Sequence, residues 1–359
     1  MKIIYLLLGA ALLAALILAG PGCDREVTYS SEDDGQLSLN SCFTCHGEEG
    51  TLLAAKGEWQ NSVHSSGSSV DYTNRGGSYY DCVRCHDHQG FVDFVETGTY
   101  HPPYDQVSAI HCFTCHSPHE RGNLTLRTDD PYTLENNYVF DHGSANLCVN
   151  CHHARIDVRD IVDSLTLSSY WGPHHGPQGD LLAGTNGFEF DDYDYETSPH
   201  AFAVEDGCIG CHMGNVQTHD GYEVGGHSFN MMFVNEVGDT SNLVKICADS
   251  ACHPSAKSYN VEGAQTEIAG LLEDLETLLY EYGVIDSTGL PLEAEVPDKN
   301  VTGAVYNFLI VAEDRSMGVH NFKYMKGLLE SSIEYMESLI VPPTSGGGGL
   351  AMLHMKTSH

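Results

Sequence analysis

Apolar residues recur at helical spacing in three stretches near the end of the chain. The first runs from Ile268 to Tyr282 with acidic residues between the apolar ones, the second over about 301–312, and the third over about 320–340. Apolar positions three and four residues apart form one stripe along a helix. Two prolines at 342 and 343 end the third pattern, and glycines follow. The pattern predicts a helical segment over 260–341 and a flexible tail over 342–359.

The amino terminus has a different pattern. Lys2 precedes an uncharged run from Ile3 to Gly22, and Cys23 follows directly. This arrangement predicts an export signal over 1–22, with a membrane anchor as the alternative. Cys23 resembles the lipidated cysteine of a lipobox, although Pro21 departs from the usual pattern. We expect an exported protein in the periplasm or at the outer membrane or cell surface. It is either lipid-anchored through Cys23 or released by a plain secretory signal, and 23–40 is a flexible linker.

The net charge excludes two classes of partner. The 359 residues include 50 Asp+Glu against 16 Lys+Arg, which gives a formal net charge of −34. Nucleic acids and anionic membranes are bound by clustered cations. We therefore expect no nucleic-acid partner, and membrane association only through a lipid on Cys23.

Cysteine and histidine supply the strongest signal in the sequence. The chain has 13 cysteines, and apart from Cys23 they form six pairs, each followed directly by a histidine. Five pairs have two residues between the cysteines, and the last has four. The motifs, numbered one to six below, are Cys42, Cys45, His46; Cys82, Cys85, His86; Cys112, Cys115, His116; Cys148, Cys151, His152; Cys208, Cys211, His212; and Cys247, Cys252, His253.

This spacing is the signature of covalent haem c attachment. The two thiols bond the haem, and the adjacent histidine is the proximal ligand of the iron. A disulfide framework leaves the histidine after every pair unexplained, and a zinc site needs four ligands per metal. We therefore expect six covalently attached haem c groups. For motif six, a disulfide between Cys247 and Cys252 stays the alternative.

A second axial histidine is expected on each iron, and local patterns select the candidates. The repeat aromatic-x-x-Ser-x-His ends at His64 and at His200, and two glycines that would allow a haem close to the backbone precede His227. Of the neighbours His174 and His175, one is expected to ligate. The distal candidates are His64, His119, His142, His174, His175, His200, His227 and His320.

Of the remaining histidines, some are expected to be structural and others are possible axial ligands. His153 follows a proximal histidine and should point elsewhere, and His354 and His359 lie in the glycine-rich tail. Four more stay open as ligands: His88, His101, His111 and His219.

The motifs predict the fold class. We expect a multihaem fold of loops and short α-helices packed around six covalent haems over 41–259, with longer C-terminal helices packed on the haems and little β-structure. Haem faces would replace much of a conventional core. The longest spacer between motifs, 154–207, is interpreted as a solvated loop, and its acidic and aromatic stretch 189–196 leaves calcium binding as a minor alternative.

The motif array, the Ser-x-His elements and the Gly318-Val319-His320-Asn321 stretch before a helix together resemble multihaem c-type cytochromes. The resemblance covers about 41–340. It is to hexahaem outer-surface cytochromes of metal-reducing bacteria and, more distantly, to pentahaem nitrite reductases. In the reductases a Gly-x-His element before a C-terminal helix supplies a distal ligand, which implies that role for His320. The lysine usual in the reductases' active-haem motif is missing here.

We therefore expect an electron-transfer protein rather than an enzyme, and no catalytic residue is assigned. Its partners would be other cytochromes and redox proteins, with extracellular metal oxides as terminal acceptors. One alternative is a haem-dependent reductase of nitrite, hydroxylamine or a sulfur oxyanion. The other, implied by the resemblance, is self-association into a conductive filament.

Overall fold

The computed structural model describes residues 50–66, 73, 81–105, 107–117, 124–204, 206–214, 216–219, 222–249 and 252–340. Several predictions fall outside these residues. They are the segments 1–22, 23–40 and 342–359, motif one with Cys42, Cys45 and His46, the lipidation site Cys23, and the distal candidate His119.

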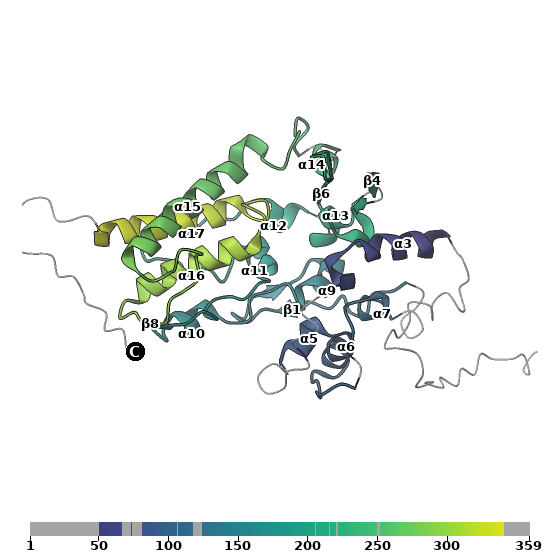
Figure 1. Cartoon of the computed structure of the whole chain (residues 1–359), viewed down its shortest axis with the longest axis horizontal. Coiled ribbons are helices and arrows are strands. Elements are labelled where there is room, and N and C mark those ends of the chain that lie inside the picture. Colours follow the sequence, from purple (N-terminus) through teal and green to yellow (C-terminus); the bar gives the residue numbers. More distant parts are fainter. Residues whose placement is uncertain are drawn as a thin grey trace, which may run out of the picture. The chain divides into compact units, whose positions relative to one another are not determined.

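Three long helices form where apolar periodicity predicts them (Figure 1). They are α15 (Ala264–Tyr282), α16 (Lys299–Asp314) and α17 (Phe322–Ile340), and each packs against the other two. The Asp298 side chain caps α16 by accepting a hydrogen bond from the backbone N–H of Asn300. Gly283 ends α15 in the left-handed conformation that glycine adopts without strain. These helices have a conventional hydrophobic core, with Leu275, Ile310 and Leu328 among its fully buried side chains.

The spacer 154–207 belongs to this core, so the prediction of a solvated loop is wrong. Val162, Leu167 and Leu181 are fully or almost fully buried against the long helices. The buried Asn307 of α16 binds the spacer through both polar atoms of its side chain. Its Oδ1 accepts from the Phe188 N–H at 2.7 Å and its Nδ2 donates to the Phe188 carbonyl at 2.8 Å.

The acidic and aromatic stretch of the spacer lies on α17. Tyr193 donates to Glu330 at 3.0 Å, Tyr195 donates to the hydroxyl of Ser331 at 2.9 Å, and Tyr324 of α17 donates to Glu189 at 3.1 Å. Within the described ranges no cluster of three or more His, Cys, Asp or Glu could hold a metal ion. Three tyrosine hydrogen bonds therefore hold this stretch on α17.

Little β-structure is present in the described residues. It consists of four two-stranded antiparallel pairs, β1 with β2, β3 with β8, β4 with β5 and β6 with β7. The strands are β1 (Tyr132–Thr133), β2 (Val139–Phe140), β3 (Thr166–Leu167), β4 (Gln217–His219), β5 (Tyr222–Val224), β6 (Met232–Val234), β7 (Thr240–Asn242) and β8 (Ala294–Glu295). The β3–β8 pair joins the spacer to the segment before α16.

Short helices account for most of the remaining regular structure. The α-helices are α3 (Gly50–Gln60), α5 (Val83–His86), α6 (His88–Thr97), α7 (Cys112–Cys115), α9 (Asn146–Val149), α10 (Val158–Val162), α11 (Gln178–Ala183), α12 (His200–Ala203), α13 (Cys208–His212) and α14 (Val244–Asp249). The 3₁₀ helices are η1 (Val63–Ser66), η3 (Gly143–Ala145), η4 (Gly226–Ser228) and η5 (Val261–Gly263).

A single helical turn lies at each of motifs two to five. α5, α7 and α13 lie within motifs two, three and five, and α9 leads into motif four, where the His152 N–H donates to the Cys148 carbonyl at 3.0 Å. Residues three apart in a helix share one face, so one turn presents both thiols of a Cys-x-x-Cys pair on the same side. The histidine that follows comes at the end of that turn. A second, smaller core around Leu134, Phe140 and Val149 supports motif four.

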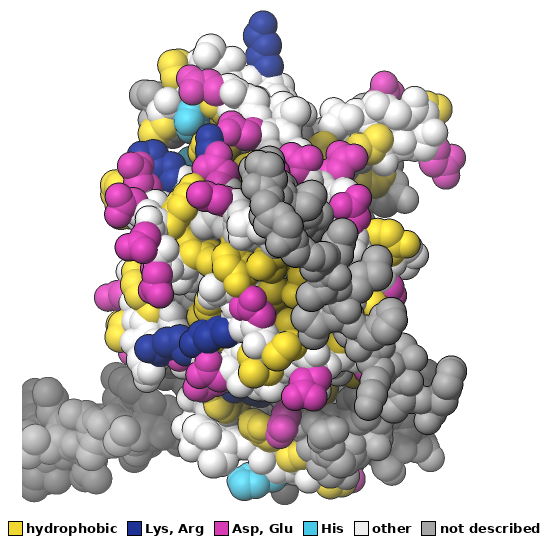
Figure 2. Space-filling model, turned by 90° about the vertical axis from the view of Figure 1, so that its left-hand side faces the viewer, with side chains coloured by type: hydrophobic (Ala, Val, Ile, Leu, Met, Phe, Trp, Pro, Cys, Tyr) yellow, Lys and Arg dark blue, Asp and Glu magenta, His cyan; other side chains and the backbone are white. Residues whose placement is uncertain are grey.

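The described surface is acidic and carries no membrane span. On the face shown in Figure 2, Asp and Glu side chains are spread over the surface and Lys and Arg are fewer. Among the helices of the described part, none is both long enough and apolar enough to cross a membrane.

Candidate haem-binding sites

The structure places each of the five described proximal histidines opposite one distal candidate. The distances between ring centres are 6.1 Å for His152 and His64, 6.2 Å for His86 and His174, 6.2 Å for His116 and His227, 6.3 Å for His212 and His320, and 6.0 Å for His253 and His200. Partners in a pair come from distant parts of the sequence. The fold, rather than local sequence, therefore creates each pair.

This separation fits a metal ion between two imidazoles. An imidazole nitrogen binds a transition metal at roughly 2 Å, and the ring centre lies roughly 1 Å behind that nitrogen. Two rings on opposite sides of one ion then have centres roughly 6 Å apart. The five pairs fit the axial ligand sets of five haem irons, with the two thiols of each motif beside the proximal ring.

Polar partners on Nδ1 orient six of these rings, five of them through a hydrogen bond. His116 Nδ1 donates to the Leu124 carbonyl at 3.0 Å, and His212 Nδ1 donates to the Phe229 carbonyl at 3.0 Å. His200 Nδ1 donates to the Val319 carbonyl at 2.6 Å. His152 Nδ1 donates to Gln178 Oε1 at 3.1 Å. The carboxylate of Asp314 lies 2.6 Å from His320 Nδ1, and that of Glu58 lies 3.4 Å from His227 Nδ1. A partner on Nδ1 fixes the tautomer and leaves Nε2 for the metal.

Burial keeps most of the paired rings neutral, which is the form that binds a metal. It lowers the pKa of His64 to about 4 and that of His174 to about 3, with nearby positive groups adding to the effect. It also lowers the pKa of His86, His116 and His212. These imidazoles are therefore ready ligands at neutral pH.

His320 has a different electrostatic environment. Burial alone would lower its pKa, but the charge and hydrogen bond of Asp314 outweigh burial and raise it. Asp314 Oδ1 lies 2.6 Å from His320 Nδ1, and the carboxylate is buried at the end of α16. Its other oxygen accepts from the backbone N–H of Ser316 at 3.2 Å and from the Ser316 hydroxyl. Asp314 was missed from sequence because nothing distinguishes it there from many other acids.

His227 is held by Glu58 of α3. The carboxylate Oε2 accepts from the backbone N–H of His227 at 2.8 Å and lies 3.4 Å from its Nδ1. Gly226 has φ +52°, and a Cβ at this position would lie 2.3 Å from the same oxygen. The glycine before His227 therefore makes room for Glu58.

The aromatic and serine side chains of the two aromatic-x-x-Ser-x-His repeats anchor the backbone before each histidine. Trp59 donates from Nε1 to the Ile110 carbonyl at 3.0 Å, and the Ser62 hydroxyl donates to the Trp59 carbonyl at 2.7 Å. In the second repeat Tyr195 donates to Ser331, and the Ser198 hydroxyl accepts from the N–H of Lys323 at 2.9 Å. The repeat therefore fixes the backbone just before each ring.

The neighbours His174 and His175 have separate roles in the structure. His174 faces His86, and its φ of +73° is a left-handed conformation that costs energy in a residue other than glycine. His175 is exposed, and its Nδ1 lies 2.9 Å from Glu313 Oε1. Only His174 therefore has the geometry of an axial ligand.

Several other histidines have no such geometry among the described residues. His142 packs on Phe140 with ring centres 4.5 Å apart and faces none of the described proximal rings. His153 is buried, with Nδ1 donating to the Val149 carbonyl at 2.8 Å, as expected of a structural residue. His88 and His111 stack on each other at 3.9 Å. His46 and His119 lie outside the described residues.

The turn between α16 and α17 connects several sites. It carries His320, and its Val319 carbonyl accepts from His200. The carbonyls of Glu313 and Asp314, at the end of α16, accept from the same Gln178 amide whose oxygen binds His152. The helical segment thereby orients imidazoles of three different pairs.

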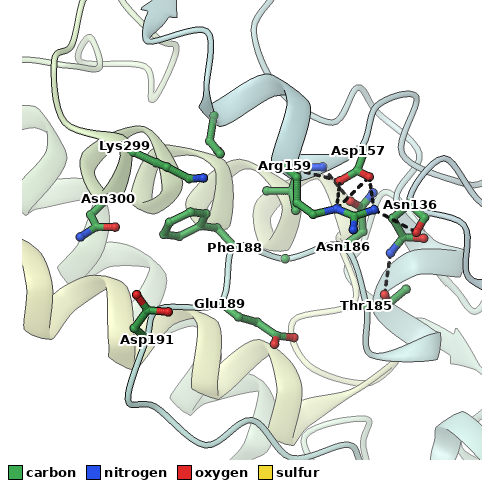
Figure 3. Close-up of a pocket in the computed structure, with 13 residues that line it drawn as sticks. Asn136, Asp157, Arg159, Thr185, Asn186, Phe188, Glu189, Asp191, Lys299 and Asn300 are labelled. Carbon is green, nitrogen blue, oxygen red and sulfur yellow. Dashed lines mark hydrogen bonds and ion pairs between the residues drawn. The ribbon is translucent and has the colours of Figure 1, made fainter.

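A separate pocket of about 580 Å³ lies beside α10 and α16 (Figure 3). On one side Arg159 pairs with Asp157, and Asn136 donates to Thr185 at 2.6 Å. Lys299 is another of its lining residues. The lining includes no cysteine and no paired histidine, so the pocket is distinct from the paired-ring sites.

Facing imidazoles beside a Cys-x-x-Cys-His motif define a c-type cytochrome. The eight described cysteines of motifs two to five form no disulfides, which leaves their thiols for haem attachment. The paired rings, their free Nε2 atoms and the adjacent thiols together form sites that fit covalently bound haem c.

The chain is similar in sequence to known polyheme cytochromes. The C-type polyheme cytochrome OmcB of Geobacter sulfurreducens is 20% identical over 84% of this chain and 55% of its own length. OmcC of the same species is 21% identical over 83% of this chain and 54% of its own length. The chain thus spans about half the length of these curated relatives. The crystal structure of the outer cell wall cytochrome OcwA has a TM-score of 0.49 and 20% identity, over 78% of this chain and 49% of that one. No protein-family model matches. The motif array and the similarity to OmcB and OmcC show that the chain is a multihaem c-type cytochrome.

Proposed function

We propose that the protein is an exported hexahaem cytochrome that carries electrons along its haems to other redox proteins. The observation that carries the proposal is the set of five ring pairs at 6.0–6.3 Å, each containing the histidine of one attachment motif. Haem c supplies a one-electron ferric–ferrous couple, and the chain supplies spacing, orientation and electrostatics. Motif one would hold the sixth haem.

The pairing favours electron transfer over catalysis on a substrate. A haem reductase needs an iron with an open coordination position, whereas each described pair offers two imidazoles to one iron. Acidic surroundings and paired histidines favour the ferric state and should keep the reduction potentials low. Extracellular metal oxides as acceptors, assembly into filaments and a lipid on Cys23 stay predictions.

Stopped-flow spectroscopy tests this proposal. The purified haem-loaded protein is reduced fully with dithionite under anaerobic conditions and mixed separately with a ferric chelate, with nitrite and with hydroxylamine. We expect rapid reoxidation by the ferric chelate and no sustained turnover of nitrite or hydroxylamine. Sustained nitrite or hydroxylamine turnover, or reoxidation by the ferric chelate no faster than in buffer alone, would contradict the proposal.

A further inference from the structure

Three other attachment motifs lie close to motif four. Cys151 of motif four donates from Sγ to the carbonyl of Cys85 of motif two at 4.0 Å. In return Cys85 Sγ donates to the Asn150 carbonyl at 3.8 Å. Motifs two and four are therefore in direct contact.

Motif four also contacts motif five. Cys208 of motif five packs against the small core that includes Val149 of motif four, and α13 packs against η3 just before α9. Gly207, at φ +47°, allows this approach, because a Cβ there would lie 3.1 Å from Cβ of Ala145. Motif four thus contacts two different neighbouring motifs.

Motif three lies close to motif four on the distal side of the predicted haem sites. On the distal side, the Phe229 ring lies 5.0 Å from His64, which faces motif four, and 6.2 Å from His227, which faces motif three. The Phe229 carbonyl also accepts from His212 of motif five.

We infer that motif four, Cys148–His152, is a junction at which electron paths from motifs two, three and five meet. The inference rests on the proposed electron-transfer function and adds a branched connectivity to it. Each cysteine would be the covalent link to its own haem, so contacts between motifs bring the attachment points of neighbouring haems together. In each step one ferrous haem is oxidised, its ferric neighbour is reduced by the same electron, and no bond is made or broken. A low-potential electron donor and a ferric acceptor complete the balance.

A pair of matched variants tests the junction. His64→Met changes the distal ligand of motif four, and His174→Met makes the same change at motif two, whose cysteine contact is with motif four. A methionine ligand raises the reduction potential of its own haem, so that haem is reduced first. The neighbouring haems then have one positive charge fewer nearby, so their reduction potentials fall.

The readout is a spectroelectrochemical titration of the full haem-loaded chain, followed by electron paramagnetic resonance. Among the five described sites, His64→Met is expected to lower the potentials of three others, and His174→Met that of one. Each shift should reach up to about tenfold in the reduction equilibrium, or about 59 mV for one electron. Equal numbers of shifted potentials in the two variants would overturn the junction.

A measurement on the unaltered protein covers the case in which a variant fails to fold. Nuclear magnetic resonance of haem methyl groups during a redox titration gives the interaction between pairs of haems. The haem of motif four should show three strong interactions, and an unbranched chain of interactions would refute the inference. This outcome is separate from the proposed function, because an unbranched chain can still reoxidise rapidly with a ferric chelate.

Discussion

Asp314 is predicted to set the reduction potential of the haem held by His212 and His320. Its buried carboxylate lies 2.6 Å from His320 Nδ1, and the two histidine rings face each other at 6.3 Å. A ferric haem carries one more positive charge than a ferrous haem, so a nearby carboxylate stabilises the ferric form. Asp314→Asn keeps the shape of the side chain and a hydrogen-bond acceptor but removes the charge.

The size of the effect follows from Coulomb's law. An iron bound to Nε2 of His320 would be roughly 7 Å from the carboxylate, and at an effective dielectric constant of about 20 the interaction is about 2 kcal/mol. Because 59 mV corresponds to about 1.4 kcal/mol for one electron, Asp314→Asn should raise this potential by about 100 mV.

The assay is a redox titration of the haem-loaded protein with optical and paramagnetic resonance detection. The matched control is Glu313→Gln, which removes the same charge one residue away. Glu313 is partly exposed and pairs with His175, which faces no proximal ring, so solvent screening should keep its effect much smaller. A shift below about 20 mV in Asp314→Asn, a shift to lower potential, or an equal shift in the control would refute the reasoning.

Three further predictions concern ligation, pH dependence and packing. His174→Ala should produce a high-spin ferric signal in paramagnetic resonance and His175→Ala should not; identical spectra would contradict the assignment. Burial raises the pKa of Asp180 to about 7, so the folded state holds this proton more tightly than the unfolded state. The contribution of Asp180 to the free energy of unfolding should therefore fall as pH rises from about 4 to about 7, by at most about 4 kcal/mol, so the difference between the unaltered protein and Asp180→Asn in denaturant titrations should change by that amount over this range. Asn307→Ala should cost about 2–4 kcal/mol of unfolding free energy because it leaves buried backbone groups of the spacer unpaired. The exposed Thr277→Ala should cost less than about 0.5 kcal/mol, and equal costs would exclude that role for Asn307.

The attachment motifs and the long helices could be predicted because their signals are local. Cys-x-x-Cys-His lies within five consecutive residues, and one amphipathic helix is visible in its own periodicity. The spacer was misjudged for the opposite reason. Its buried residues such as Leu167 and Phe188 follow no regular period, and they are buried only because Asn307 and the long helices bind them.

The pairing of histidines shows the same limit. Sequence patterns selected His64 and His200 because the aromatic-x-x-Ser-x-His repeat is contained in six consecutive residues. They could not show that His64 faces His152, or that His174 rather than His175 faces His86, because those choices depend on contacts between distant segments. Asp314 belongs to this group as well, since its role exists only once α16 and the turn to His320 are folded.

Quantitative paramagnetic resonance of the fully oxidised, purified protein tests the central claim most directly, which is that the facing imidazoles are axial ligand pairs. The account predicts at least five low-spin ferric haems per chain, one for each described pair, and no high-spin ferric signal from them. Fewer than five low-spin haems, with the difference present as high-spin ferric iron, would contradict it.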